Sequence, residues 1–425
     1  MKTPRQASAS TPTRFDALPR NRFFTLVALA LIPLSSWGTS VLERPAPELS
    51  PQQQLDWAVG RSFAHRPWVS SPATTTARDG LGPLFNARSC AGCHPGNGQG
   101  QLPTKGLGTV LRLPKDSLFG SQLQDRALPG FTAEGRIAWR VSPHAPRPHR
   151  QYLIAEYRQL SASARLAPML IGLGKLDAVD RAQILAWEDI DDRDNDGVSG
   201  RAATLDNGQL GRFGWKASQA SLREQIAQAF AEDMGIDSAI RRATRCDQIS
   251  AAAAENDRMA ARARCERASG ADQPDGSEIS PKILGAVEHY IANLAIPGSR
   301  ADHHGPAART FAEIGCSSCH RPTFVTASGT IYPYSDLLLH DMGDGLNDDV
   351  AEGAARPEEW RTAPLWGLGI RSAEADNTRL LHDGRANSIR EAIAWHGGEA
   401  RAARQRFNAL SQAQQARLLE FLKEL

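Results

Sequence analysis

CAGCH at residues 90–94 and CSSCH at residues 316–320 are the two stretches that decide how this chain of 425 residues is built. In each, two cysteines stand three positions apart, so one helical turn places both thiols on the same face. Two such thiols can bond the two vinyl groups on one edge of a porphyrin, and the histidine that follows can bind the iron. The pattern Cys-x-x-Cys-His therefore predicts covalent attachment of a c-type haem.

Chance is a poor explanation of two such matches. With 6 cysteines and 11 histidines in 425 residues, one random match is expected roughly 0.002 times. The alternatives are a zinc site, which would need four ligands from paired motifs, and a redox dithiol, which would need a βαβ setting that the sequence lacks. We therefore predict two covalently bound haems c, and the residues expected to hold them are Cys90, Cys93, His94, Cys316, Cys319 and His320.

The first forty residues have the pattern of an export signal. Several arginines precede the apolar run FFTLVALALIPL at residues 23–34, and small residues follow it. This length suits the core of a signal peptide, whereas a membrane span needs about 20 apolar residues. We predict a signal peptide at residues 1–40, a periplasmic location and no membrane span in the mature protein. An uncleaved anchor is the alternative.

The charge balance and the remaining cysteines limit which partners and cross-links we expect. The chain has 49 Lys and Arg against 47 Asp and Glu, so we expect no nucleic-acid-binding face. Cys246 and Cys265 lie outside the haem motifs. An exported compartment permits a disulfide between them, and two unrelated free thiols are the alternative.

Helical patterns dominate the rest of the chain. Apolar residues recur at helical spacing in residues 222–234, 283–294 and 418–425, and long alternating strand patterns are absent. We expect a mainly α fold with two cytochrome-c-like haem domains and long loops. The expected parts are an N-terminal haem c domain at residues 41–240, a polar insertion at residues 241–280 and a C-terminal haem c domain at residues 281–425.

A short repeat favours two related halves. APMLIGLG at residues 167–174 follows the first haem motif, and APLWGLG at residues 363–369 follows the second. A segment that recurs at the same place after each motif suggests an internal duplication. Chance similarity is the alternative for a repeat this short.

Six further motifs carry a resemblance to a known family. They are GLGPLFNARS at residues 80–89, DGVSGR at 196–201, FGWK at 213–216, LHDMG at 339–343, HDGR at 382–385 and WHGG at 395–398. With the haem motifs, they resemble the bacterial di-haem oxidoreductase family, some members of which are labelled thiol oxidoreductases. That family is distantly related to the di-haem cytochrome c peroxidases and to the di-haem enzyme that matures methylamine dehydrogenase.

The resemblance implies a di-haem oxidoreductase with its haems at a domain interface and with bound calcium. A peroxidase-like activity would pass electrons from a small periplasmic electron-donor protein through the C-terminal haem to the N-terminal haem, where peroxide or another small oxidant is reduced. Two alternatives stay open: a non-catalytic di-haem electron-transfer protein, and an oxidase of a partner protein or of thiols.

The reaction depends on the ligand opposite each proximal histidine. In the related peroxidases, a methionine binds the C-terminal haem from a helix that follows a His-x-Gly turn, and the resemblance places His396 at that position. We therefore expect His396 to be the distal ligand, with Met342 as the alternative. No histidine follows His94 at the peroxidase spacing. The N-terminal haem is then either open to peroxide or closed by one of three other histidines, His65, His144 and His149.

Two further roles can be assigned to candidate residues. Trp215, in the FGWK motif, is a candidate electron relay between the haems, and a plain core tryptophan is the alternative. Cleavage of peroxide also needs a general acid or base, for which Asp177 and Glu156 are conceivable.

An acidic loop is a candidate calcium site. Asp192, Asp194 and Asp196 stand at alternate positions before a glycine, an arrangement of oxygen ligands that suits calcium. The glutamate of an EF-hand is missing, because the twelfth position of this loop is Ala203. A bare acidic loop is the alternative.

Overall fold

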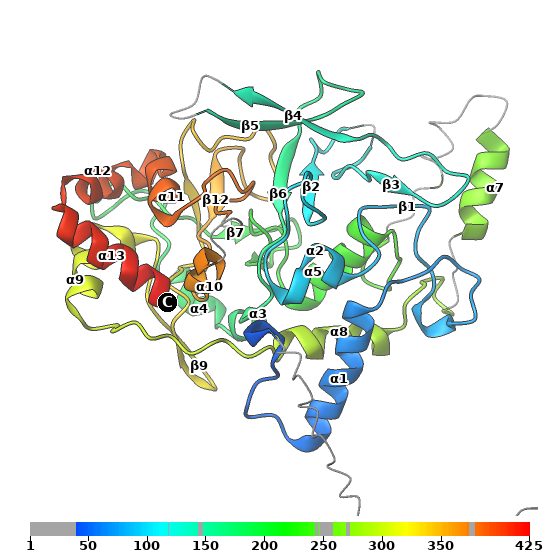
Figure 1. The fold of residues 1–425 in the computed structure, drawn as a ribbon, viewed down its shortest axis with the longest axis horizontal. Helices are drawn as coiled ribbons and strands as arrows, with labels where there is room; N and C mark the ends of the chain where they lie inside the picture. The colour runs from blue at the N-terminus through cyan, green and yellow to red at the C-terminus, as the bar shows by residue number, and fades with distance from the viewer. Residues whose placement is uncertain are drawn as a thin grey trace, which may run out of the picture. The chain divides into compact units, whose positions relative to one another are not determined.

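The computed structural model describes residues 40–117, 119–142, 148–242, 246, 258–268, 273–373 and 379–425 (Figure 1). The predicted signal peptide lies outside the described residues except for its last position, and so does His144. The α-helices are α1 (Pro51–His65), α2 (Cys90–Cys93), α3 (Leu173–Asp177), α4 (Arg181–Leu185), α5 (Leu222–Gln228), α7 (Arg258–Ala268), α8 (Pro281–Ala292), α9 (Pro306–Glu313), α10 (Leu368–Ala373), α11 (Ile389–Trp395), α12 (Arg401–Ala409) and α13 (Gln412–Glu424).

The prediction of a mainly α fold is wrong. Within the described residues, the strands pair into six separate two-stranded antiparallel sheets. Strands this short show too few alternations to be recognised by period, and each is fixed by its partner rather than by its own residues. The strands are β1 (Leu84–Phe85), β2 (Thr109–Arg112), β3 (Arg126–Ala127), β4 (Ile137–Ser142), β5 (His149–Ile154), β6 (Ser163–Leu166), β7 (Ala203–Thr204), β8 (Leu210–Gly211), β9 (Phe324–Thr326), β10 (Gly329–Ile331), β11 (Leu339–Asp341) and β12 (Glu359–Arg361).

Three helices predicted from their apolar spacing are confirmed as α5, α8 and α13. α8 packs along α1 (Figure 1), where Gly60 allows close approach: a Cβ there would lie 2.0 Å from the carbonyl oxygen of Ala286. α5 continues into a π-helical turn at Ala229–Asp233. α13 packs against α9 and α10 and begins with the Ser411 and Gln414 capping box. These helices bury the apolar stripes seen in the sequence.

The two repeated segments contact each other. Gly172 precedes α3 with φ +74°, and its Cβ would lie 2.2 Å from the Trp366 ring. Gly367 precedes α10 with φ +70°, and its Cβ would lie 2.9 Å from the Met169 methyl carbon. Each glycine thus receives a large side chain from the other segment. Such a reciprocal contact is what a two-fold relation between two copies produces, and it supports the interpretation of the repeat as a duplication.

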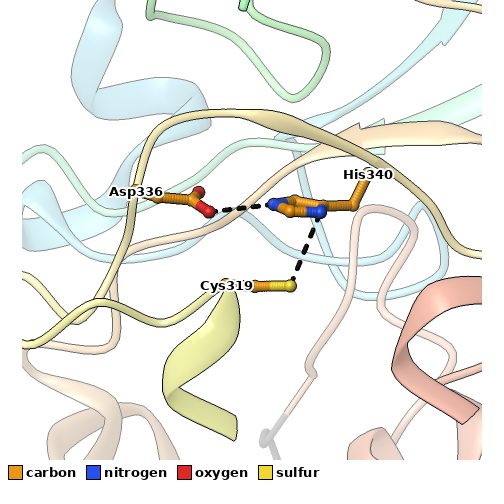
Figure 2. Close-up of side chains that lie close together, drawn as sticks. All are labelled: Cys319, Asp336 and His340. Atoms are coloured by element: carbon orange, nitrogen blue, oxygen red, sulfur yellow. Dashed lines mark hydrogen bonds and ion pairs between the residues drawn. The ribbon is translucent and has the colours of Figure 1, made fainter. Parts of the chain in front are cut away.

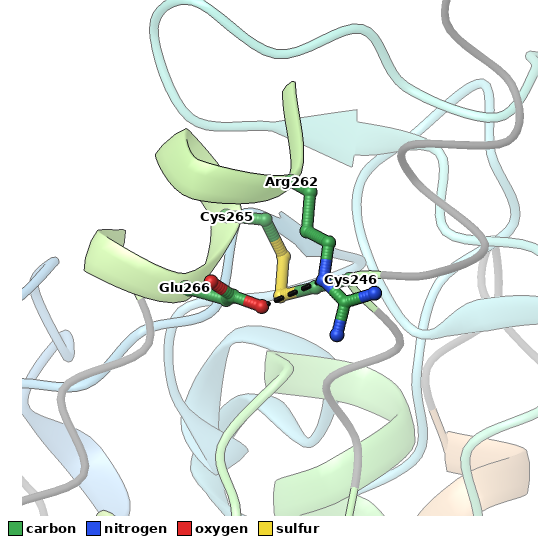
Figure 3. The surroundings of a disulfide bond; sticks show 4 residues. All are labelled: Cys246, Arg262, Cys265 and Glu266. Atoms are coloured by element: carbon green, nitrogen blue, oxygen red, sulfur yellow. Dashed lines mark hydrogen bonds and ion pairs between the residues drawn. A yellow bond between two sulfur atoms is a disulfide. The ribbon is translucent and has the colours of Figure 1, made fainter. Parts of the chain in front are cut away.

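The predicted disulfide is confirmed. Cys246 and Cys265 are joined (Figure 3), and the bond ties α7 to the chain that precedes it. Arg262 and Glu266 form an ion pair beside the bond, with 2.8 Å between Nε and Oε1. Residues 39–425 form one compact unit, and the boundaries proposed for two haem domains stay predictions. None of the described helices is both long and apolar enough to cross a membrane.

Candidate functional site

The first cavity lies beside the motif at residues 90–94. The Ser89 hydroxyl caps α2 by accepting from the Gly92 N–H at 3.1 Å, which holds the two cysteines on one short helical turn. Cys90, Cys93 and His94 all line the cavity. Its other walls are largely apolar and come from residues 168–173 and from α5 with its π turn. The motif therefore faces an apolar space rather than solvent.

His94 is held in the form that a metal ligand requires. Its Nδ1 lies 2.6 Å from the carbonyl oxygen of Pro168. A carbonyl only accepts, so Nδ1 carries the proton and Nε2 keeps its lone pair. Burial lowers the pKa of His94 to about 4, so the ring is neutral at physiological pH. Metal-binding histidines are commonly oriented by such a bond to the other ring nitrogen.

The second cavity contains the same arrangement twice. Nδ1 of His320 lies 2.8 Å from the carbonyl oxygen of Tyr334, and Nδ1 of His396 lies 2.8 Å from that of Ala392. Both histidines line this cavity. Burial lowers the pKa of both, that of His320 to about 4. The structure thus brings together two neutral imidazoles, each with Nε2 available as a ligand.

The other histidines that line the second cavity, His340 and His382, are held by contacts of their own. His340 has both ring nitrogens bonded to carboxylates, and the His382 ring stacks on Trp360 with 3.7 Å between centroids. Met342 lines the cavity as well. Among the described residues, His396 and Met342 are therefore the candidates for a second ligand beside His320.

The first cavity differs in this respect. Of the described residues that line it, His94 is the sole histidine. His65 instead bonds the Tyr290 hydroxyl with 2.7 Å between Nε2 and the oxygen. His149 lies against the edge of Trp395, away from this cavity. The structure does not bring either histidine opposite His94.

Three large side chains line both cavities: Trp215, Arg361 and Arg371. The Trp215 indole N–H donates to the Leu166 carbonyl oxygen at 2.9 Å, which fixes the ring. Burial lowers the pKa of each arginine to about 10. Arg361 donates to two backbone carbonyls and, within the described residues, forms no ion pair. Sequence reasoning identified the tryptophan and missed both arginines.

These residues fit haem better than a zinc site or a dithiol. Burial raises the pKa of Cys90 and of Cys316 to about 12, whereas dithiol exchange uses a thiolate. Around Cys90 and Cys93, the described residues offer no group of three metal-ligating side chains, whereas a structural zinc site needs four ligands. The cysteines in the two motifs are not joined by disulfides. A haem would place its rings in the apolar cavities and its propionate carboxylates near the half-buried guanidinium groups of Arg361 and Arg371, which favour anionic partners. The neutral imidazoles of His94 and His320 would bind the iron.

A buried polar cluster lies next to the second motif (Figure 2). His340 donates from Nε2 to Asp336 at 2.9 Å, and its Nδ1 lies 2.7 Å from Glu399 and 3.5 Å from the Cys319 sulfur. Burial acts to lower the pKa of His340, but Cys319 and Asp336 raise it well above 6.5. Glu399 also accepts from the backbone N–H of Asp341 at 3.0 Å. These hydrogen bonds therefore hold β11 next to the second motif.

The acidic loop brings its three carboxylates together. One oxygen each from Asp192, Asp194 and Asp196 lies within 4.8 Å of the others. Asp196 also accepts from the Ser318 hydroxyl, inside the second motif, at 3.0 Å. The loop is thus connected to the turn that carries Cys316 and Cys319.

Neither predicted acid or base lines the first cavity. Glu156 is exposed and forms an ion pair with Arg136, with 2.7 Å between Oε1 and Nε. Asp177 accepts from the Leu222 N–H at 3.0 Å, at the start of α5. The carboxylates that do line the cavity include Glu232 and Asp233, in the π turn. Two adjacent acids at the end of an apolar helical stripe were the signal that sequence reasoning missed.

Comparison with known proteins gives a family. No curated protein matches the sequence. Among solved structures, hydrazine synthase from Kuenenia stuttgartiensis matches with 15% identity and a TM-score of 0.34, over 96% of this chain and 100% of that chain. The family model described as "Di-haem oxidoreductase, putative peroxidase" matches residues 156–425. The chain belongs to this family of haem-containing oxidoreductases.

Proposed function

We propose that the protein is a c-type di-haem peroxidase with one open and one closed haem. The observation that carries this proposal is the asymmetry of the cavities: His396 accompanies His320 in the second, whereas His94 has no second histidine in the first. A haem held through His94 alone would leave a place beside its iron for peroxide. An iron with two axial ligands transfers electrons without binding substrate.

Each haem would be held by its own motif. Cys90 and Cys93 would bond the N-terminal haem and His94 would bind its iron, with Cys316, Cys319 and His320 in the same roles for the C-terminal haem. When bound, haem supplies one-electron redox chemistry at iron. The chain would contribute the apolar walls, the neutral imidazoles, and the half-buried Arg361 and Arg371 as partners for propionates.

Trp215 is the proposed connection between the two sites. Its side chain lines both cavities, and its indole is held by Leu166. Electrons would enter from a small periplasmic donor protein at the C-terminal haem, pass Trp215 and reach the N-terminal haem, where peroxide is reduced. This direction follows from placing the open iron at His94.

Spectra of the purified ferric protein test the proposal. We expect one high-spin and one low-spin haem in electron paramagnetic resonance, because one cavity offers a second histidine and the other does not. We also expect the high-spin signal alone to change when peroxide is added. Two low-spin haems that ignore peroxide would instead support an electron-transfer protein.

Removal of one cysteine pair should remove one haem. The double change Cys90→Ser and Cys93→Ser is expected to lower the denatured mass by one haem and to abolish peroxide reduction. The matched control is Cys246→Ser with Cys265→Ser, which removes a disulfide and should leave both haems in place. An unchanged mass in the first variant would contradict covalent attachment at this motif.

We also propose calcium in the acidic loop. The three carboxylates converge, and Asp196 is bonded to Ser318 in the second motif, so an ion there would stabilise the turn that binds haem. Calcium titration of the chelator-treated holoprotein, with Asp194→Asn as the comparison, would test this site.

Export to the periplasm remains our proposal for the location. It is supported by the charged and apolar pattern of residues 1–40 and by the disulfide between Cys246 and Cys265, which is a bond typical of oxidising compartments. Cell fractionation with sequencing of the mature N-terminus would test it.

A further inference from the structure

The first cavity has a polar end that the roles above do not explain. It is formed where the π turn at Ala229–Asp233 follows α5. π turns often mark functional positions in helices. The Asp233 carbonyl oxygen accepts from the N–H groups of Asn86 and Ala87, at 2.7 and 3.0 Å. These bonds attach the turn to the segment that leads into the first haem motif.

The two carboxylates of the turn have different surroundings. Glu232 is bound by Arg112 and by Arg241, the latter with 3.1 Å between Nη2 and Oε1. It also accepts from the Gln228 amide at 2.9 Å. Asp233 forms no ion pair among the described residues. Its side-chain donor is the Gln122 amide, 2.7 Å from Oδ1.

This difference separates the two acids in proton affinity. Burial opposes ionisation of both, but Arg112 lowers the pKa of Glu232 to about 2. Burial raises the pKa of Asp233 to about 6, and the negative charge of Glu232 adds to the effect, while Gln122 and Arg112 oppose it. The other titratable neighbours are Cys90 and Cys93, which would be uncharged in thioether form. Adjacent groups with such separated values are typical of acid and base pairs in enzymes.

Unpartnered polar atoms in the same cavity point to a small polar ligand. Gln228 and Arg165 are both more than nine-tenths buried and line the first cavity. Oε1 of Gln228 and Nε of Arg165 have no hydrogen-bond partner. Buried polar atoms are seldom left without partners. An unpartnered amide acceptor and an unpartnered guanidinium donor in the cavity that Asp233 also lines suit a molecule such as hydrogen peroxide, whose oxygens both donate and accept.

We infer that Asp233 is the catalytic residue that moves the proton when the O–O bond of peroxide is broken in the first cavity. This inference rests on the proposed peroxidase function. Reduction of one peroxide takes two electrons from an external one-electron donor and two protons from solvent, breaks the O–O bond, and gives two waters. The Asp233 carboxylate takes the proton of one oxygen and returns it to the oxygen that leaves as water, so the carboxylate is regenerated.

The expected pH dependence of the rate follows from the protonation state in which Asp233 must act. The carboxylate accepts the proton first, so it must be ionised when peroxide arrives. Its folded pKa of about 6 predicts a rate that is full above pH 7 and falls as the pH drops through 6. Arg112 is charged and Glu232 is ionised across this range, so neither should produce this acid limb.

The test compares variants of the haem-loaded full chain. Asp233→Asn keeps the shape and the acceptor for Gln122, and we expect its rate of peroxide reduction to fall about 100-fold or more and to lose the acid limb. Asp233→Glu should recover part of the rate with a displaced limb. Asp177→Asn is the matched control: it is also a partly buried acid with a raised pKa, but it lies outside the cavity, and its rate should stay within about twofold.

The possible results distinguish a failure of the proposed peroxidase function from a failure of the role assigned to Asp233. Haem content and the ferric spectrum, recorded for each variant, identify any loss of folding or of cofactor. A wild-type protein that reduces no peroxide would overturn the proposed function and this inference together. An active wild type with an Asp233→Asn variant of unchanged rate and pH profile would overturn the inference alone, and so would an Asp233→Glu variant whose acid limb is not displaced.

Discussion

Replacing His396 with alanine is expected to convert the C-terminal haem from low spin to high spin. His396 directly follows α11, its Nδ1 is bound to the Ala392 carbonyl, and it lines the cavity of His320. Without that imidazole, the iron would keep one strong axial ligand. Electron paramagnetic resonance should show two high-spin haems in place of one, and the potential of this haem should change because axial ligands set it.

Two further variants make this result decisive. His65→Ala removes a histidine that bonds Tyr290 outside both cavities, and its spectrum should match the wild type. Met342→Ala should also leave the spectrum unchanged. If His396→Ala stays low spin while Met342→Ala becomes high spin, the methionine is the ligand and His396 has another role.

Gly172→Ala is expected to destabilise the protein by about 3 kcal/mol. The residue has φ +74°, where a side chain costs about 1 kcal/mol. Its Cβ would also lie 2.2 Å from the Trp366 ring, and overpacking of this kind costs about 1–3 kcal/mol. Trp366 lines the first cavity, so haem binding should weaken as well. Denaturant unfolding of the holoprotein measures the change in free energy.

Gly130→Ala is the matched control for that experiment. Gly130 has φ +88° but no atom within 4 Å of its Cβ position, so only the backbone cost of about 1 kcal/mol applies. The difference between the two losses in unfolding free energy measures the cost of the contact with Trp366. Equal losses would show that the close packing of the repeated segments contributes nothing measurable.

Local patterns predicted the parts of the fold that depend on local physics. α5, α8 and α13 show an apolar stripe that any burying surface would satisfy, and they were found. β2 pairs with β6, more than fifty residues later, in the register Thr109 to Leu166. No property of residues 109–112 alone specifies that partner, and the same holds for the other short strands, which is why a mainly α fold was expected.

The candidate site divides in the same way. The cysteines and the histidines that follow them were recognisable because covalent haem attachment, which stays a prediction, would require a fixed spacing within five residues. Asp233 and Arg361 were not, because burial and the neighbours across the fold give each its character: Gln122 for the acid, and two backbone carbonyls for the arginine. Glu156 and Asp177 have the right functional group but face the wrong surroundings.

The reciprocal contact between the repeated segments has a consequence for the proposed electron transfer. Trp366 fills the space at Gly172, and Met169 fills the space at Gly367, so neither segment can slide without a clash. Packed interiors of this kind resist compression. Electron tunnelling falls steeply as the gap between redox centres widens. If electrons pass between the two cavities as we propose, this packing would hold the distance between them constant, because the two segments line the cavities.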